Sequence, residues 1–181
     1  MRFKSMALLL ALAFVFIVLA GCEHVISFNN PAEKRRESIS DFISGNTPGE
    51  VAAEPGETYR TKWFEFTIHS IEKVDSYAEH AAEDGHQLYR VIITEKNVWD
   101  DIIHMGIFDF YMDAPDFTEY VWAIPPLDDT MMPEAFDLEP GEAIQHVMIF
   151  EVPVNTAELA LMYTENNENG EDGATYSIYI G

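Results

Sequence analysis

The sequence predicts an all-β fold, an antiparallel β-sandwich of about seven strands that follows an N-terminal leader and a flexible tether. After about residue 59, apolar residues alternate with polar ones at the two-residue period of half-buried strands. The apolar runs are short and are separated by clusters of Pro, Gly and Asp, without a long amphipathic helical pattern. The region from residue 59 to residue 181 is also long enough to bury one hydrophobic core.

Residues 1–21 have the pattern of a lipoprotein signal peptide. Arg2 and Lys4 precede an apolar run of roughly 15 residues, shorter than the roughly 20 that span a bilayer. The run ends in Leu-Ala-Gly-Cys, which resembles the lipobox at which Cys22 becomes the acylated first residue of the mature protein. We therefore expect a lipid anchor at Cys22, on the extracytoplasmic side of a bacterial cell membrane or envelope. An uncleaved membrane anchor and an ordinary secretory signal are the alternatives.

Cys22 is the only cysteine in the chain. If it carries lipid, no thiol remains for a disulfide, even though an exported domain could form one. The sandwich must then be stable through its hydrophobic core alone.

The charge balance is strongly acidic. The chain has 32 Asp and Glu against 10 Lys and Arg, and the leader contributes two of those bases and no acid. Without the leader, 8 bases and 32 acids leave a net charge of −24. This charge excludes nucleic acid as an expected partner, because binding to phosphate needs a cationic surface. It is compatible with simple solubility, and also with capture of divalent cations or a basic ligand.

Residues 22–58 are predicted to form the tether. They are polar and rich in Pro and Gly, and the Asn30-Pro31 start followed by Glu33 predicts one short helix that ends near Gly45. An isolated helix of this length is only marginally stable. As a coil, roughly 36 residues span about 30 to 35 Å, so the domain can search some distance from its anchor.

The sandwich is predicted over residues 59–181. In the first strand the alternation slips near Ser70, which indicates a β-bulge. Pro140-Gly141 forms a turn, and the following strand places His146 on one face with Met148 and Phe150. The expected strands are residues 64–68, 88–94, 106–112, 119–124, 143–152, 158–163 and 175–180.

Four stretches carry a resemblance to a known family. They are Phe64–Ile68, Tyr89–Asn97, Leu138–Glu142 and Phe150–Pro153, within a likeness that covers residues 62–180. The succession resembles an immunoglobulin-like domain family common in bacterial lipoproteins, whose fold is similar to that of a secreted mycobacterial immunoprotective antigen. The resemblance implies an immunoglobulin-like sandwich and an exported location. It transfers no active site, and His146 and the acidic loop before Gln87 depart from the family pattern.

Two loops have residues that could bind a metal. His80 and His86 share one loop with several carboxylates, a donor set that zinc or copper accepts. Asn167 and Asn169 lie in an oxygen-rich stretch that partly matches the first half of a calcium loop. Solvated loop residues in the first case, and a hairpin turn in the second, are the more ordinary explanations of these patterns.

Aromatic residues give the best indication of a binding surface. The segment from residue 108 to residue 122 is dense in rings, and if Phe108 and Phe110 face the core, Tyr111 faces outward. Most rings are expected to fill the core, whereas Trp99, Tyr111 and Tyr120 are the candidates for exposed ligand contacts.

The sequence therefore predicts a lipid-anchored binding or envelope-interaction protein for a protein or glycan ligand, without catalytic activity and without a cofactor. The alternative is an accessory lipoprotein that binds calcium or zinc. An envelope-polymer hydrolase is third, because carboxylate pairs occur by chance among 32 acids and no nucleophile elbow, phosphate loop or dinucleotide fingerprint is found.

Overall fold

The computed structural model describes residues 50–166 and 172–180. The predicted leader, Cys22, most of the predicted tether with its short helix, Asn167 and Asn169 lie outside the described residues. Within the described ranges, no helix is both long enough and apolar enough to cross a membrane.

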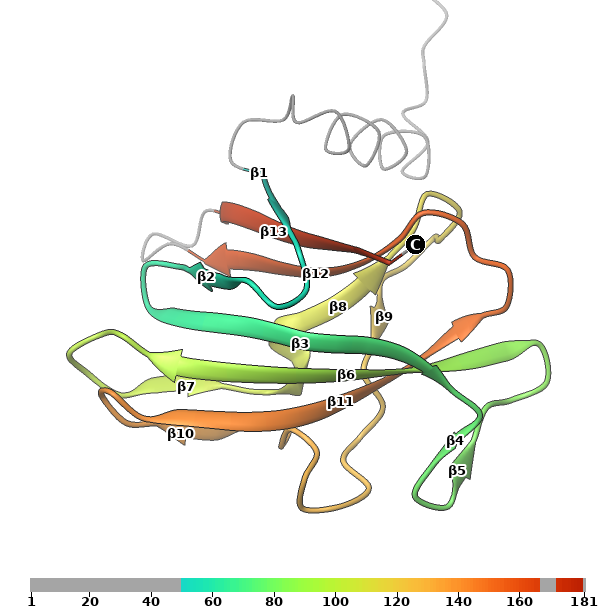
Figure 1. The fold of residues 1–181 in the computed structure, drawn as a ribbon, viewed down its shortest axis with the longest axis horizontal. Coiled ribbons are helices and arrows are strands. Elements are labelled where there is room, and N and C mark those ends of the chain that lie inside the picture. Colours follow the sequence, from blue (N-terminus) through green and yellow to red (C-terminus); the bar gives the residue numbers. More distant parts are fainter. Residues whose placement is uncertain (1–49, 167–171, 181) are drawn as a thin grey trace, which may run out of the picture. The chain divides into compact units, whose positions relative to one another are not determined.

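Two β-sheets pack face to face (Figure 1). The five-stranded sheet has the order β1 (Glu50–Ala53), β13 (Asp172–Ile180), β12 (Leu159–Asn166), β8 (Phe110–Asp113) and β9 (Val121–Trp122). The four-stranded sheet has the order β11 (Ala143–Pro153), β6 (His86–Asn97), β3 (Phe64–Val74) and β2 (Thr58–Arg60). All pairs are antiparallel except β1 with β13. The predicted antiparallel sandwich is confirmed.

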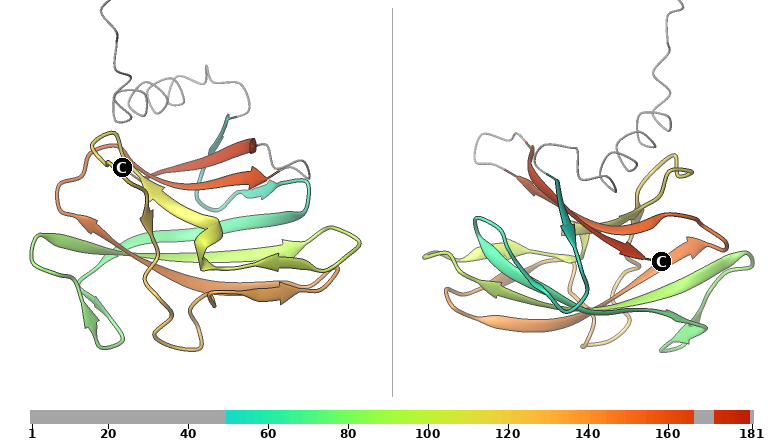
Figure 2. Two further views of the ribbon diagram at one scale, coloured as in Figure 1. Left: turned by 180° about the vertical axis from the view of Figure 1, so that it is seen from behind. Right: turned by 45° about the horizontal axis from the view of Figure 1, so that its top comes forward.

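Shorter elements complete the described part of the chain. β7 (Ile103–Met105) pairs with β10 (Phe136–Leu138), and β4 (Ser76–Tyr77) pairs with β5 (His80–Ala81). A 3₁₀ turn, η1 (Ile107–Asp109), leads directly into β8. Figure 2 shows β8 and β12 from behind, in front of the four-stranded sheet.

The predicted strand periodicity places the core. In β11 the side chains at positions 146, 148, 150 and 152 are buried while their neighbours at 145, 147 and 151 are more exposed, as the alternation predicts. β3 shifts register between Ile68 and Ser70, which confirms the predicted bulge. The long registers of β6 with β3 and with β11 make β6 the central strand of its sheet.

The sandwich begins earlier in the sequence than the pattern predicts. Glu50–Ala53 pairs in parallel with Thr175–Ile178, and Ala53 is buried in the core. This strand lies in the region expected to be tether. It is only four residues long and has Pro and Gly nearby, so its alternation is too short to be recognised in the sequence.

Phe66 lies at the centre of the core and is fully buried. The centroid of its ring lies within 6.0 Å of the centroids of five other aromatic rings, those of Tyr59, Phe64, Phe110, Tyr163 and Tyr176. These rings come from both sheets, so Phe66 joins the two layers by edge and tilted ring contacts.

A second, smaller cluster lies on the outer face of the four-stranded sheet. Leu88 and Ile149 are buried there with Met131, and Tyr77 of the β4–β5 hairpin packs against them. Tyr77 also hydrogen bonds through its hydroxyl to Thr130 Oγ1 at 2.8 Å. The hairpin and the segment around Met131 therefore cover one end of this sheet.

Phe66→Ala should destabilise the sandwich by about 3 to 5 kcal/mol, because it removes a ring from the closed core and leaves a cavity. Urea unfolding followed by circular dichroism measures the change. Phe108→Ala is the matched control: that ring is 50% exposed, so its loss should cost less than about 1 kcal/mol. Similar losses for the two variants would contradict this account of the core.

Candidate functional site

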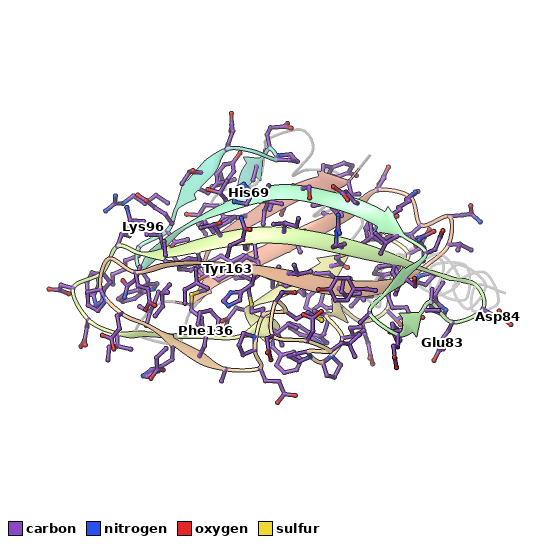
Figure 3. The ribbon with its side chains drawn as sticks, turned by 60° about the horizontal axis from the view of Figure 1, so that its bottom comes forward. His69, Glu83, Asp84, Lys96, Phe136 and Tyr163 are labelled. Atoms are coloured by element: carbon purple, nitrogen blue, oxygen red, sulfur yellow. The ribbon has the colours of Figure 1, made fainter. Side chains whose placement is uncertain are left out.

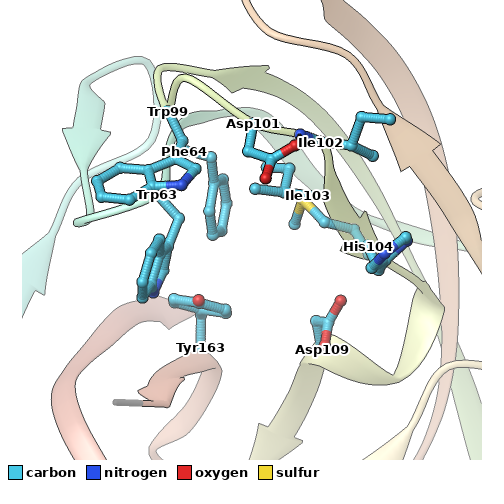
Figure 4. Close-up of a pocket in the computed structure, with 10 residues that line it drawn as sticks. Trp63, Phe64, Trp99, Asp101, Ile102, Ile103, His104, Asp109 and Tyr163 are labelled. Atoms are coloured by element: carbon cyan, nitrogen blue, oxygen red, sulfur yellow. Dashed lines mark hydrogen bonds between the residues drawn. The ribbon is translucent and has the colours of Figure 1, made fainter. Parts of the chain in front are cut away.

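A pocket of about 360 Å³ opens at the end of the sandwich where β6 runs into β7. Its walls come from the β2–β3 turn, the β6–β7 loop, η1 and β12, segments that are far apart in the sequence. Figure 4 shows the labelled side chains around an open centre, with Tyr163 and Asp109 facing the residues of the β6–β7 loop. The lining residues are Trp63, Phe64, Trp99, Asp101, Ile102, Ile103, His104, Met105, Asp109 and Tyr163.

Two indoles form the aromatic wall. The rings of Trp63 and Trp99 meet edge to face, with centroids 4.8 Å apart. Trp63 is held by Thr61, whose buried hydroxyl accepts hydrogen bonds from the backbone N–H groups of Trp63 and Phe64. Val98 N–H donates to the Trp63 carbonyl at 3.1 Å, which fastens the loop to the turn. The wall is thus fixed by backbone contacts and by ring packing.

Asn97 determines the course of the β6–β7 loop. Its side chain is buried, accepts the Trp99 N–H at 2.7 Å, and donates to the carbonyls of Asp101 and Leu138. One amide group therefore satisfies three backbone groups of the loop and its neighbour. This explains why a polar residue ends the buried face of β6, and how Trp99 is positioned over the pocket.

Asp109 supplies a half-buried carboxylate opposite the indoles. Its Oδ2 accepts the Gly106 N–H at 2.7 Å. Gly106 is required because a Cβ there would lie 2.0 Å from the backbone oxygen of Glu134. Burial raises the pKa of Asp109 above its usual value, and the Gly106 hydrogen bond opposes that rise.

A second acid lies near Asp109, in the closed interior. Glu95 is fully buried on β6; its Oε2 lies 3.4 Å from Nδ1 of the buried His146, and its Oε1 has no partner. Burial raises the pKa of Glu95, the contact with His146 opposes the rise, and the charge of Asp109 adds to it. Phe136 packs on the His146 ring with centroids 4.8 Å apart. His146, which departs from the pattern of the family that the sequence resembles, lies against this buried acid.

Tyr163 forms the floor of the pocket. Its ring contacts Phe64 and Phe110 at centroid distances of 5.0 and 5.3 Å, so the floor is continuous with the core. Burial raises the pKa of Tyr163, and the charges of Asp109 and Glu165 raise it further. The phenol is therefore neutral at physiological pH. The pocket offers aromatic and aliphatic walls with carboxylates at two places, Asp101 and Asp109.

The predicted aromatic contacts are divided between two places. Trp99 lines the pocket. Tyr111 and Tyr120 instead contact each other as a tilted pair, with ring centroids 4.4 Å apart, and form an aromatic cluster with Trp122 and Phe108. Tyr120, Trp122 and Phe108 are each more than 40% exposed. The condition that both Phe108 and Phe110 face the core holds only for Phe110, which is buried; η1 interrupts the strand alternation, and Phe108 is exposed.

The structure places His80 and His86 near one common partner, Glu151, which the sequence pattern did not indicate. His80 Nε2 lies 3.2 Å from Oε2 of Glu151, which comes from β11. Sequence reasoning missed Glu151, Trp63 and Glu95, and considered Asp109 only as one of several carboxylates that could pair by chance. Only the strand register and the loop course place these residues, and the local sequence pattern gives neither.

No family model and no curated protein matches the chain. Solved structures similar in fold include a candidate lipoprotein, ycdA, from Bacillus subtilis, with TM-score 0.52 and 15% identity over 67% of this chain and 38% of that chain. The yjhA protein of Bacillus subtilis has TM-score 0.52 and 14% identity, covering 71% of this chain and 98% of the other. The secreted protein MPT63 of Mycobacterium tuberculosis has TM-score 0.53 and 9% identity, covering 72% and 98%. The predicted likeness in fold to a secreted mycobacterial antigen is confirmed.

Asp109→Asn should change the dependence of stability on pH. Burial raises the pKa of Asp109, so the folded state binds this proton more tightly than the unfolded chain does. The free energy of unfolding therefore falls as the pH rises from about 4 through the folded-state pKa. The variant should match the wild type near pH 3 and become increasingly more stable than it above pH 4. Urea unfolding at a series of pH values measures this difference.

Asp101→Asn is the control, because it removes an exposed carboxylate from the opposite side of the pocket and leaves the half-buried one in place. If Asp109→Asn changed the free energy of unfolding by the same amount at all pH values, the assigned burial of Asp109 would be wrong.

Proposed function

We propose that the protein is a lipid-anchored, extracytoplasmic binding protein without catalytic activity, which holds a small organic cation in the pocket. One observation carries the proposal: Trp63 and Trp99 face the half-buried carboxylate of Asp109 across a concave cavity. Pockets of roughly 300 to 1,000 Å³ with apolar walls and a few polar groups are typical of small-molecule sites.

The chemistry of the walls favours a positive ligand. Indole faces attract ammonium groups, and the Lys62 ammonium already lies 4.2 Å from the Trp63 ring centroid and 5.9 Å from that of Trp99, so a ligand cation must share these rings with it or displace it. Asp109 lies on the opposite side of the pocket. Asp101 adds a second negative charge. The net charge of −24 without the leader attracts cations from a distance and repels anions. An amine or quaternary ammonium with a compact apolar body fits all of these features.

Anchoring at Cys22 is the second part of the proposal. The lipobox-like end of the leader supports it, as does the fold likeness to the candidate lipoprotein ycdA. A doubly or triply acylated cysteine holds a protein stably in a membrane, whereas a single chain binds only weakly. The anchor places the protein on the extracytoplasmic side of the cell envelope.

A second surface is a candidate for a larger partner. The aromatic cluster of Phe108, Tyr111, Tyr120 and Trp122 is a group of exposed rings of the kind that stacks on sugar rings or anchors protein interfaces. Its occupant would be the glycan or protein partner that the sequence predicts. The pocket is a defined cavity, so it is the stronger candidate for a small ligand.

Choline should bind in the pocket and change the fluorescence of Trp63 and Trp99. A Trp122→Phe background leaves these two as the only tryptophans. The neutral isostere 3,3-dimethylbutan-1-ol should bind at least about tenfold more weakly, because it lacks the charge that indoles and Asp109 recognise. In the same background, Trp99→Ala and Asp109→Asn should each weaken choline binding at least about tenfold, measured by titration.

Tyr120→Ala is the matched control, because it removes an aromatic ring from the exposed cluster and leaves the pocket unchanged. Equal binding of choline and its neutral isostere, or choline binding that Asp109→Asn leaves intact, would contradict recognition of a cation.

Cys22→Ser should abolish lipid attachment. Cells grown with an alkyne-tagged palmitate should label the wild-type protein and leave the variant unlabelled, because Cys22 is the only cysteine. Mass spectrometry of the wild-type protein should place its first residue at Cys22. A label that persists in the variant, or a first residue elsewhere, would contradict a lipobox.

A further inference from the structure

We propose that His80, Glu83, His86 and Glu151 form a zinc-binding site, independent of the ligand pocket. The site lies at the opposite end of β6, which begins at His86 and ends at the loop that forms the pocket. Figure 3 labels Glu83 and Asp84 at one end of the sandwich and Lys96 and Phe136 at the other.

Four side chains converge from separate elements. Glu83, His86 and Glu151 each place one ligand atom within 4.8 Å of the other two. His80 lies beside this trio: its Nε2 is 3.2 Å from Glu151 Oε2, which places it to become a fourth ligand. His80 is in β5, Glu83 in the β5–β6 loop, His86 at the start of β6 and Glu151 in β11. The set therefore combines a local sequence motif with one residue from a neighbouring strand.

Backbone contacts hold the loop against β11. Glu83 N–H donates to Glu151 Oε1 at 2.5 Å, and His86 N–H donates to the Glu83 carbonyl at 2.9 Å. Gly85 takes a positive φ of 85°, and its carbonyl accepts the Val154 N–H at 2.9 Å. The loop is thus fixed at both ends, and the ligand side chains project from a defined backbone. Such preorganisation reduces the entropy cost of binding a metal.

The side chains are in suitable states to coordinate a cation. The Nδ1 atom of His86 is buried and has no hydrogen-bond partner in the described structure, an arrangement that costs free energy unless a further group binds it. Exposed acids in the same loop, Glu79 and Asp84, add negative potential around the site.

The donor set favours zinc over calcium. Two imidazoles and two carboxylates suit zinc, which binds nitrogen and oxygen at about 2.0 to 2.2 Å in a tetrahedron, whereas calcium takes six to eight oxygens. Ligand atoms around zinc lie about 3.4 Å apart, so the three groups that now lie within 4.8 Å of one another must move closer, and His80 must move toward them. Glu83 is exposed and has the room to move inward.

A metal here would strengthen one part of the fold. His80 belongs to the β4–β5 hairpin, whose Tyr77 packs over Leu88 and Ile149, while Glu151 and His86 belong to the sheet beneath. Zinc would therefore crosslink the hairpin to the sheet. Since a ligand that binds only the folded state stabilises it by mass action, zinc should raise the melting temperature.

The test is calorimetric titration of zinc chloride into the full-length protein in a nonionic detergent, with melting curves recorded in parallel. One zinc ion per chain is expected at micromolar or tighter affinity, with a rise of several degrees in melting temperature. His86→Ala and Glu151→Gln should each weaken binding at least about tenfold. Cobalt(II) should give the visible absorption bands of a tetrahedral complex in the wild type only.

Matched controls are His69→Ala and His104→Ala, which remove exposed histidines that contact Thr94 and Asp137, outside the four-residue site. Both should bind zinc as the wild type does. Melting curves in chelator show whether each site variant is folded, so a lost heat of binding in a folded variant supports the site. Absence of a zinc heat in the wild type would overturn the proposal. So would undiminished binding by both site variants, or equal stabilisation by calcium.

Discussion

The packing of Phe66 between the two sheets is the interaction on which the rest of the structure depends. Cys22 is the only cysteine in the chain, so no disulfide can form within the domain, and the two layers are joined by side-chain packing. Phe66 is fully buried and contacts rings from β2, β3, β8, β12 and β13. Two of these rings, Phe64 and Tyr163, also line the pocket. The pocket floor is therefore the end of the core, and its shape is as rigid as the packing that supports it.

β6 shows how one strand serves both structure and binding. Its inward face is apolar through Val91 and Ile93, and then becomes polar at Glu95 and Asn97, which are equally buried. Asn97 is fully used in fixing the loop that carries Trp99, whereas Glu95 keeps one oxygen without a partner. Buried polar groups of this kind cost stability unless they are satisfied. The cost falls at the pocket end of the strand, where the fold gains a positioned loop.

The sequence predicts the sandwich well because its strands obey a local rule. Alternation in β3 and β11, the bulge near Ser70 and the turn at Pro140-Gly141 depend on neighbouring residues only. The sites could not be predicted to the same extent, because their residues meet through register and loop course. Trp63 and Tyr163 are 100 positions apart, and Glu151 meets His86 only because β11 pairs with β6 so that Pro153 lies opposite His86. The strand alternation fails at Phe108, because a 3₁₀ turn takes the place of a strand there.

The two proposed sites share one electrostatic logic. A net charge of −24 without the leader disfavours the compact state through self-repulsion, and that repulsion is largest where carboxylates are brought together. The fold brings Glu95 and Asp109 close at one end of β6, and Glu83 and Glu151 at the other. At each end, aromatic rings or imidazoles lie beside the acids, so a bound cation finds direct partners as well as a favourable potential. A cation bound at either end would reduce the repulsion between the carboxylates that folding brings together. The relief of that repulsion would contribute to the affinity for the cation.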